Sequence, residues 1–209
     1  VSFNILEGLR PLDGIGNEGL LLDEDRVGAA RSVVHDLDPD ILVLNEALYC
    51  QPFGGRAVDY GGLFHYRHGI GALYDGAWGN AILSRHPITR SREMPIYNRG
   101  GLSAVIDTPM GGLTVASYHP HPRRQPENKA LDFVDLLAGL DGPLLVCGDL
   151  NCISPEDSVD RTELVEAFRR FSAEPEATVD RFIESGRQVF ATMARLGLSD
   201  AVPVDGRRY

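Results

Sequence analysis

The sequence has few cysteines, no excess of positive charge and no long apolar run. Its three cysteines, Cys50, Cys147 and Cys152, form no C-x-x-C pair, which excludes a disulfide framework and favours a reducing compartment. Lys and Arg total 20 against 30 for Asp and Glu, which gives a net charge of −10. This charge excludes a diffuse positive electrostatic field that would hold nucleic acid. No segment approaches the roughly 18 apolar residues of a membrane helix, and no basic-then-apolar leader precedes the first strand. We therefore expect a cytoplasmic protein, monomeric and without a membrane span, while secretion remains open.

The two ends of the sequence resemble cut edges. The chain opens directly in a strand-like run, residues 1–6, and stops after a turn rich in Pro, Asp and Gly with Arg207, Arg208 and Tyr209. Because these last three residues are typical of the start of another strand, we expect the protein to continue beyond Tyr209. A leader before Val1 is left open.

Turn residues divide the sequence into short strand-like and helix-like segments. With 43% hydrophobic residues, 23 Gly and 13 Pro, the composition is typical of one globular α/β domain, which we expect to span residues 1–209. The predicted strands are residues 1–6, 41–44, 63–66, 80–84, 102–107, 113–119 and 143–146. Residues 109–112 carry a hairpin signature, so the strands on either side of them are predicted to be antiparallel. Hairpins combined with strand-helix-strand units favour a mixed sheet, or two packed sheets, flanked by helices.

Capping residues and apolar spacing predict four helices. The first follows the N-cap candidate Asp23 and ends before Pro39, and the others cover residues 127–140, 155–171 and 177–196. The first two helices are expected to bury, respectively, Val27, Ala30, Val34 and Leu37, and Leu131, Val134, Leu137 and Ala138.

Polar side chains occur inside or at the ends of the apolar strands. The set consists of Asn4, Glu46, His119, Asp149 and Asn151. Strand ends can converge on one edge of a sheet, where chemistry is often found. Mg²⁺ takes oxygen ligands and keeps several waters, so a carboxylate with an amide, such as Glu46 with Asn4, suits it. A nearby Asp can orient water, a His can contact phosphoryl oxygens and an amide can donate to a non-bridging oxygen, a combination that indicates phosphoester hydrolysis.

Five segments carry a family resemblance, in family order. They read SFNIL at residues 2–6, DILVLNE at 40–46, GNAILSR at 79–85, VASYH at 115–119 and VCGDLN at 146–151. Together they resemble the successive motifs of the endonuclease/exonuclease/phosphatase superfamily, and residues 198–201 resemble the lead into its last strands. The resemblance implies a four-layer α/β/β/α sandwich of the deoxyribonuclease I-like fold, with two packed mixed, largely antiparallel sheets. It also implies metal-dependent cleavage of phosphoesters.

The resemblance assigns a role to each residue of the polar set. Glu46 is similar to the family's metal-binding Glu and Asn4 to its partner, with Mg²⁺ as the expected ion and Mn²⁺ as an alternative. His119 is similar to the His that contacts the phosphate. Asp149 is similar to the Asp that orients the attacking water, and Asn151 to the Asn that holds the phosphate.

Three further residues and two departures from the family pattern complete this interpretation. Asn80, Tyr118 and Arg123 are expected to bind the substrate. Asn45 stands where many family members have Gln, so the amide side chain next to the metal-binding Glu is shorter than in those members. The family's final Ser-Asp-His motif, which supplies an Asp and the general-base His, has no counterpart, and we expect it beyond Tyr209.

Two other motifs support alternative functions. His119 and His121 are spaced as a two-His metal pair, but the carboxylate-rich continuation of a zinc site of metallo-β-lactamase type is missing. Residues 14–19 match the fingerprint G-x-G-x-x-G, which would indicate an NAD-dependent oxidoreductase. That fingerprint should turn directly from strand into helix, whereas seven residues separate Leu6 from its first glycine. A catalytically silent binding module on the same fold is a third alternative.

The sequence restricts the substrate only weakly. Its acidic balance disfavours tight nonspecific binding of duplexes, because such binding depends on Lys and Arg. Arg85, His86 and Arg90 are candidates for a local positively charged edge. Arg123 and Arg124 are candidates for contact with a substrate phosphate, although for these two an exposed charged loop is the favoured interpretation. We expect a nuclease-like phosphodiesterase, with a phosphomonoesterase or a lipid or inositol phosphate hydrolase as the alternative.

Aromatic residues and cysteines near the motifs have a simpler interpretation. Phe64, Tyr74 and Trp78 are candidates for stacking on a base, but packing is favoured. Cys147 and Cys152 flank the Asp149 motif, where strand packing is favoured over thiol catalysis.

Overall fold

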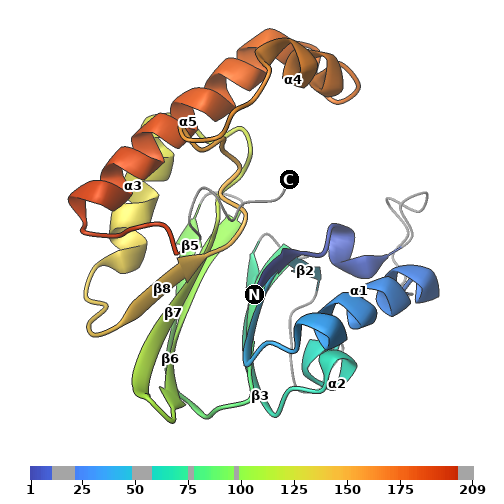
Figure 1. Ribbon diagram of the computed structural model, residues 1–209, viewed down its shortest axis with the longest axis vertical. Coiled ribbons are helices and arrows are strands. Elements are labelled where there is room, and N and C mark those ends of the chain that lie inside the picture. Colours follow the sequence, from blue (N-terminus) through green and yellow to red (C-terminus); the bar gives the residue numbers. More distant parts are fainter. Residues whose placement is uncertain (11–21, 49–57, 75–77, 97–98, 202–209) are drawn as a thin grey trace. The chain divides into compact units, whose positions relative to one another are not determined.

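The computed structural model in Figure 1 describes residues 1–10, 22–48, 58–74, 78–96 and 99–201. The chain divides into two compact units, the first formed by residues 1–120 and 136–150, and the second by residues 121–135 and those from 151 onward. Three expectations fall outside the described residues, namely those for the glycine fingerprint at 14–19, for the side chain of Trp78 and for the strand start at residues 207–209. None of the described helices is long and apolar enough to cross a membrane.

The first sheet, in the order β1-β2-β4-β3, is covered by helices on its outer face (Figure 1). Its strands are β1 (Ser2–Asn4), β2 (Ile41–Leu48), β3 (His68–Tyr74) and β4 (Trp78–Ser84), and a 3-10 turn at Glu7–Leu9 follows β1. Strand β1 runs parallel to β2, and the other pairs are antiparallel. Helices α1 (Glu24–Leu37) and α2 (Tyr60–Phe64) contribute Ala30, Val34 and Phe64 to one core cluster with Leu42 and Leu44. The predicted cap is confirmed, because the Asp23 side chain accepts from the backbone of Arg26.

The second sheet has the order β5-β6-β7-β8. Its strands are β5 (Ile88–Ile96), β6 (Arg99–Thr108), β7 (Gly111–His119) and β8 (Leu144–Cys147). Only the β7-β8 pair is parallel, and Thr108 pairs with Gly111 across a two-residue turn, which confirms the predicted hairpin. The core between the sheets joins Val43 and Ile82 of the first to Leu102 and Val115 of the second. Two packed, mixed and largely antiparallel sheets with helices confirm the predicted fold class.

The second unit is helical. Helix α3 (Pro126–Leu137) begins in it and ends in the first unit, and α4 (Arg161–Phe168) and α5 (Pro175–Arg195) lie wholly within it. Helices α4 and α5 are joined by the Phe168 and Phe182 rings, whose centroids are 5.3 Å apart, and by the Arg161–Asp180 ion pair at 2.8 Å. These contacts hold two helices that are adjacent in sequence against each other.

One strand prediction was wrong, and two strands, β3 and β5, were not predicted. Residues 63–66, predicted as a strand, contain the end of α2, because Asp59 caps that helix through the backbone of Gly62 and His65 ends it in a left-handed conformation. Strand β5 was not predicted, because most of its side chains are exposed and polar. An edge strand of this kind lacks the apolar alternation that identifies a half-buried strand.

All four predicted helices are present, but α2 was not predicted, and some bounds and buried faces were wrong. Helix α4 begins at Arg161 rather than near residue 155, because Asp160 caps it through two backbone N–H groups. Leu37, expected to be buried, is 57% exposed. On α3, Leu131 and Val134 are exposed at 61% and 39%, and Ala138 lies beyond the helix end. The buried face of α3 instead carries Lys129, Phe133 and Leu136, so it is rotated from the predicted one.

Candidate functional site

A β-bulge determines where Glu46 points. Strand β2 continues to Leu48, so Glu46 lies inside the strand and not at its end, and the pairing with β4 shifts between Asn45 and Ala47. Glu46 is the extra residue, with a φ of 57°. Ala47 belongs to the same helix-covered cluster as Leu44, a place that Glu46 would occupy in a regular strand. The bulge thus keeps the carboxylate out of an apolar core.

The freed carboxylate faces the second sheet. The Oε1 atom of Glu46 lies 3.8 Å from Nε2 of His119, the last residue of β7, whose side chain is 2% exposed. Two residues 73 positions apart in sequence therefore meet at one end of the sheet sandwich.

The segment after β8 is held against β1, β2 and β7. Gly148 has a φ of 137°, and a Cβ on it would lie 2.2 Å from the Tyr118 carbonyl oxygen, so only glycine fits. The next residue, Asp149, accepts a hydrogen bond at its Oδ2 from Nδ2 of Asn4, at 2.9 Å. The backbone N–H of Asp149 donates to Oδ1 of Asn45, also at 2.9 Å. Both the carboxylate and the backbone of Asp149 are thereby fixed.

A buried chain of amides links the two sheets beside Asp149. Asn45 is 0% exposed, and its Nδ2 donates to Asn80 Oδ1 at 2.8 Å and to Ser117 Oγ at 3.1 Å. Nδ2 of Asn80 donates in turn to the Gly100 carbonyl at 2.9 Å. Since the Asp149 N–H can only donate and the Gly100 carbonyl can only accept, the orientation of both amides is determined. We call the chain from Asp149 through Asn45 and Asn80 to Gly100 the amide relay.

The amide relay was largely missed by the sequence analysis. Asn45 was noted only as a departure from the family pattern, and Asn80 was expected to contact the substrate. The available signal was the occurrence of Asn45, Asn80 and Ser117 within apolar strands, where buried polar groups require partners.

The donor atoms near Glu46 fit a hard cation. Among the described residues no three or more His, Cys, Asp and Glu side chains are grouped to hold a metal ion. Mg²⁺ does not need such a group, because it keeps several waters and uses one or two carboxylates with substrate phosphates. The side chain of Glu46 is 15% exposed. Oδ1 of Asn4 accepts from Leu6 N–H at 2.9 Å and keeps a second lone pair, so both predicted ligands offer oxygen.

The other predicted site residues have different surroundings. Tyr118 is fully buried in the first unit. Asn151 belongs to the second unit, has a φ of 47° and accepts a hydrogen bond at its carbonyl from Lys129 Nζ. Arg123 is exposed, while Arg124 forms a bidentate pair with Asp132. Within the second unit, Arg124 is therefore the more constrained of the two arginines.

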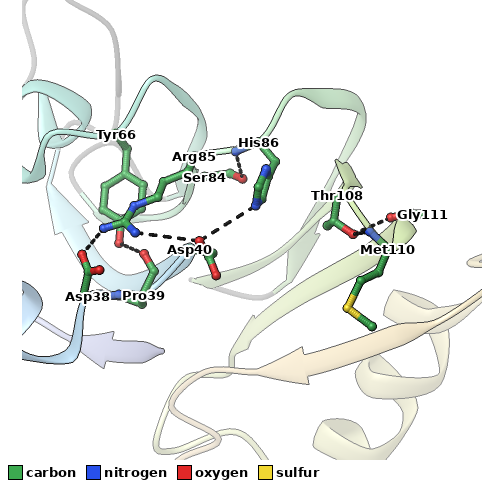
Figure 2. A network of polar contacts seen from close by, with 10 residues as sticks. All are labelled: Asp38, Pro39, Asp40, Tyr66, Ser84, Arg85, His86, Thr108, Met110 and Gly111. Atoms are coloured by element: carbon green, nitrogen blue, oxygen red, sulfur yellow. Dashed lines mark hydrogen bonds and ion pairs between the residues drawn. The ribbon is translucent and has the colours of Figure 1, made fainter.

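The predicted positive edge is partly neutralised (Figure 2). Arg85 forms ion pairs with Asp38 and, at 3.8 Å, with Asp40, and His86 Nε2 lies 3.9 Å from Asp40. The hydrogen bond and charge of Arg85 lower the pKa of Asp38. Nearby, Tyr66 donates to the Pro39 carbonyl at 2.7 Å, and its burial raises its pKa to about 12. This group therefore offers less positive charge than its sequence indicates.

Two cavities lie away from Glu46 and Asp149. One, of about 400 Å³, is bounded by the starts of β3 and β5, including His68 and Arg90. The other, of about 280 Å³, lies between α1 and α2 and includes Arg31 and Arg85. His68 pairs with Ser84, the residue of β4 farthest from the Glu46 bulge, so these cavities belong to the opposite end of the first sheet.

The packing interpretation holds for the described aromatic residues and Cys147. Phe64 and Tyr74 are buried in the two core clusters. Cys147 packs against the core between the sheets, and burial raises the pKa of its thiol to about 11. A thiol with this pKa is protonated at neutral pH and is a poor nucleophile.

Comparisons with known proteins agree with this architecture. The sequence profile described as Endonuclease/Exonuclease/phosphatase family matches residues 1–189. An endonuclease/exonuclease/phosphatase from Beutenbergia cavernae superposes with a TM-score of 0.56 at 21% identity, covering 79% of this chain and 51% of that one. An AP endonuclease from Archaeoglobus fulgidus gives 0.58 at 17% identity, covering 82% and 65%. ANGEL2, a 2',3'-cyclic phosphatase solved with adenosine-2',3'-vanadate, gives 0.56 at 17% identity, covering 80% and 55%.

These structural likenesses show the fold. The chain spans about half to two thirds of the length of these solved chains. No curated protein matches its sequence.

Proposed function

The chain belongs to the endonuclease/exonuclease/phosphatase family, and on that premise we propose that it hydrolyses a phosphodiester bond with a divalent cation. The observation that carries the proposal is the convergence on Asp149. Its carboxylate is held by Asn4 and its backbone by Asn45, next to the Glu46 that the bulge turns toward His119. These residues come from four separate segments, and their chemistry matches the requirements of phosphoester hydrolysis.

Four candidate residues of the first unit, Asp149, Asn4, His119 and Asn80, have the following roles in this proposal. Asp149 orients the attacking water, and the hydrogen bond from Asn4 keeps one carboxylate oxygen in place so that the other faces the water. His119 contacts a phosphoryl oxygen. Asn80, whose amide is engaged at both ends, acts through the amide relay and not on the substrate.

Glu46 and Asn4 are the residues that would hold Mg²⁺ or Mn²⁺. When bound, such a cation supplies positive charge that stabilises the phosphoryl oxygens and the leaving oxyanion. Asn151, two residues after Asp149 in the chain, donates its amide N–H to a non-bridging oxygen without adding charge. Arg123 is exposed and remains the proposed substrate contact outside this set.

The substrate class we favour is a nucleic acid or a similar phosphodiester. The net charge of −10 restricts affinity for a bare phosphate backbone, so we expect binding that depends on the cation and weakens with salt. A phosphomonoester or a lipid or inositol phosphate is the competing class.

The test is hydrolysis by the intact protein of plasmid DNA, single-stranded DNA, RNA, sphingomyelin, inositol phosphates and bis(p-nitrophenyl) phosphate. Each substrate is assayed with MgCl₂, with MnCl₂ and with EDTA. Glu46→Gln and Asp149→Asn are each expected to lower kcat/KM by about 100-fold or more, because each removes a charge from the reacting site. Asp107→Asn, which removes an exposed carboxylate on β6, is the matched control and should keep wild-type activity.

Chelator-sensitive cleavage of one substrate class, lost in both site variants, would support the proposal and identify the substrate. Cleavage that persists in EDTA or in Asp149→Asn would refute it. Cleavage of phosphomonoesters only would replace the diesterase proposal with the competing one.

A further inference from the structure

Lys129 stands apart from the other basic residues of the chain. It is the single lysine among 20 Lys and Arg residues, and its side chain is 0% exposed. Lysine carries a compact, strongly hydrated charge, and removing that charge from water is costly unless close partners replace the water. The position of this lysine therefore needs an explanation.

The partners of Lys129 include the backbone of a predicted catalytic residue. Its Nζ donates to the Asn151 carbonyl at 2.6 Å, and it lies 5.3 Å from the centre of the Phe182 ring. A hydrogen bond from an ammonium group is stronger than a neutral one, and the ring adds a cation–π attraction. Asn151 itself has a φ of 47°, a conformation that Asn tolerates but that its surroundings must maintain.

Helix α5 also contacts residues 151–153. The Ile153 N–H donates to the Phe182 carbonyl at 3.2 Å. A Cβ on Gly186 would lie 1.7 Å from the Ile153 carbonyl oxygen, so the backbone of α5 contacts that of Ile153. Glycine is unfavourable in the middle of a helix, and this close backbone contact is a reason for the presence of Gly186 in α5. Residues 151–153 are thus fixed by α3 through Lys129 and by α5 through Phe182 and Gly186, all within the second unit.

We propose that Lys129 is a positioning residue that fixes the Asn151 carbonyl and thereby the direction of the Asn151 amide. The link to catalysis rests on the proposed function, whereas the structural fixation does not. Arginine, which the chain uses at all its other basic positions, has a broad planar head with five N–H groups. A fully buried site suits the compact ammonium better.

The first measurement tests the fixation without assuming any activity. Amide hydrogen exchange is followed at Ile153 in the wild type and in Lys129→Met, with Arg187→Met as a control that removes an exposed charge from α5. We expect exchange at least tenfold faster in Lys129→Met and unchanged in the control. Lys129→Gln, which keeps an N–H donor on a shorter stem, serves in place of a Met variant that does not fold. Exchange at the wild-type rate in a folded Lys129 variant would overturn the proposal.

The second measurement is a double-mutant cycle with Asn151→Ala, using bis(p-nitrophenyl) phosphate and MgCl₂. If Lys129 acts through Asn151, Lys129→Met lowers kcat about tenfold in the wild-type background and changes KM less than twofold. In the Asn151→Ala background, the same substitution changes kcat less than twofold. A general structural role would lower activity by the same factor in both backgrounds, which would refute the inference. A wild type without turnover would refute the proposed function and leave the exchange result to decide the fixation.

Discussion

Replacing Asn45 by Asp is expected to destabilise the protein in a way that depends on pH. The substitution keeps the oxygen that accepts from the Asp149 N–H but exchanges the Nδ2 donor for a second oxygen. Asn80 Oδ1 then faces an acceptor in place of a donor, while Ser117 can rotate its hydroxyl to donate. Asn80 cannot reverse its amide without losing the bond to the Gly100 carbonyl.

Two costs add in this variant. An unsatisfied buried acceptor costs about 1–3 kcal/mol. Burial also raises the pKa of the new carboxyl group, and each unit of that rise costs about 1.4 kcal/mol when the group is ionised. We therefore expect Asn45→Asp to lower the free energy of unfolding by about 3–5 kcal/mol at pH 8.

The sign of the pH dependence follows from the protonated form. A protonated carboxyl group can donate to Asn80 Oδ1 as the amide does, so the folded protein holds this proton more tightly than the unfolded chain. The loss of stability is then small below the unfolded pKa of about 4 and grows as pH rises through the higher folded pKa. The deficit should consequently be smaller at pH 5.5 than at pH 8.

Urea unfolding followed by circular dichroism at both pH values measures the effect. Asn128→Asp, which adds the same charge at a partly exposed position of α3, is the control and should change stability by less than about 0.5 kcal/mol. An Asn45→Asp deficit below that limit, or one that is equal at pH 5.5 and pH 8, would refute the amide relay as described.

Two further predictions concern buried side chains. Because burial raises the pKa of the Cys147 thiol to about 11, iodoacetamide should alkylate it at least tenfold more slowly in the folded protein than in urea at pH 8.5, measured with Cys50 and Cys152 replaced by Ser. The same shift should lower stability as pH rises from about 9 to about 11, since the unfolded chain ionises first. The Ser185 hydroxyl on α5 is buried without a hydrogen-bond partner among the described residues, so Ser185→Ala should raise the free energy of unfolding by about 1 kcal/mol. Ser158→Ala, at an exposed position, should not change it, and a less stable Ser185→Ala would contradict the assignment.

The sequence alone indicated the fold class and the residues of the candidate site. The apolar run of β2 and the turn between β6 and β7 could be predicted, because strand burial and turn type depend on a few consecutive residues. The order of the motifs added the family resemblance. Edge strand β5 and the buried face of α3 were beyond such reasoning, because β5 lacks apolar alternation and the buried face of α3 includes the charged residue Lys129.

Only the tertiary structure determined how the site residues are held. The bulge at Glu46 exists in the pairing of β2 with β4, and the amide relay joins Asn45 to residues 35 and 104 positions away. The contact between Lys129 and Asn151 likewise spans 22 positions. Sequence patterns report which residues a strand or helix buries, whereas the partner of a buried polar group depends on which elements pack together. For this reason the sequence could propose candidate site residues, but it could not give the hydrogen-bond network that orients them.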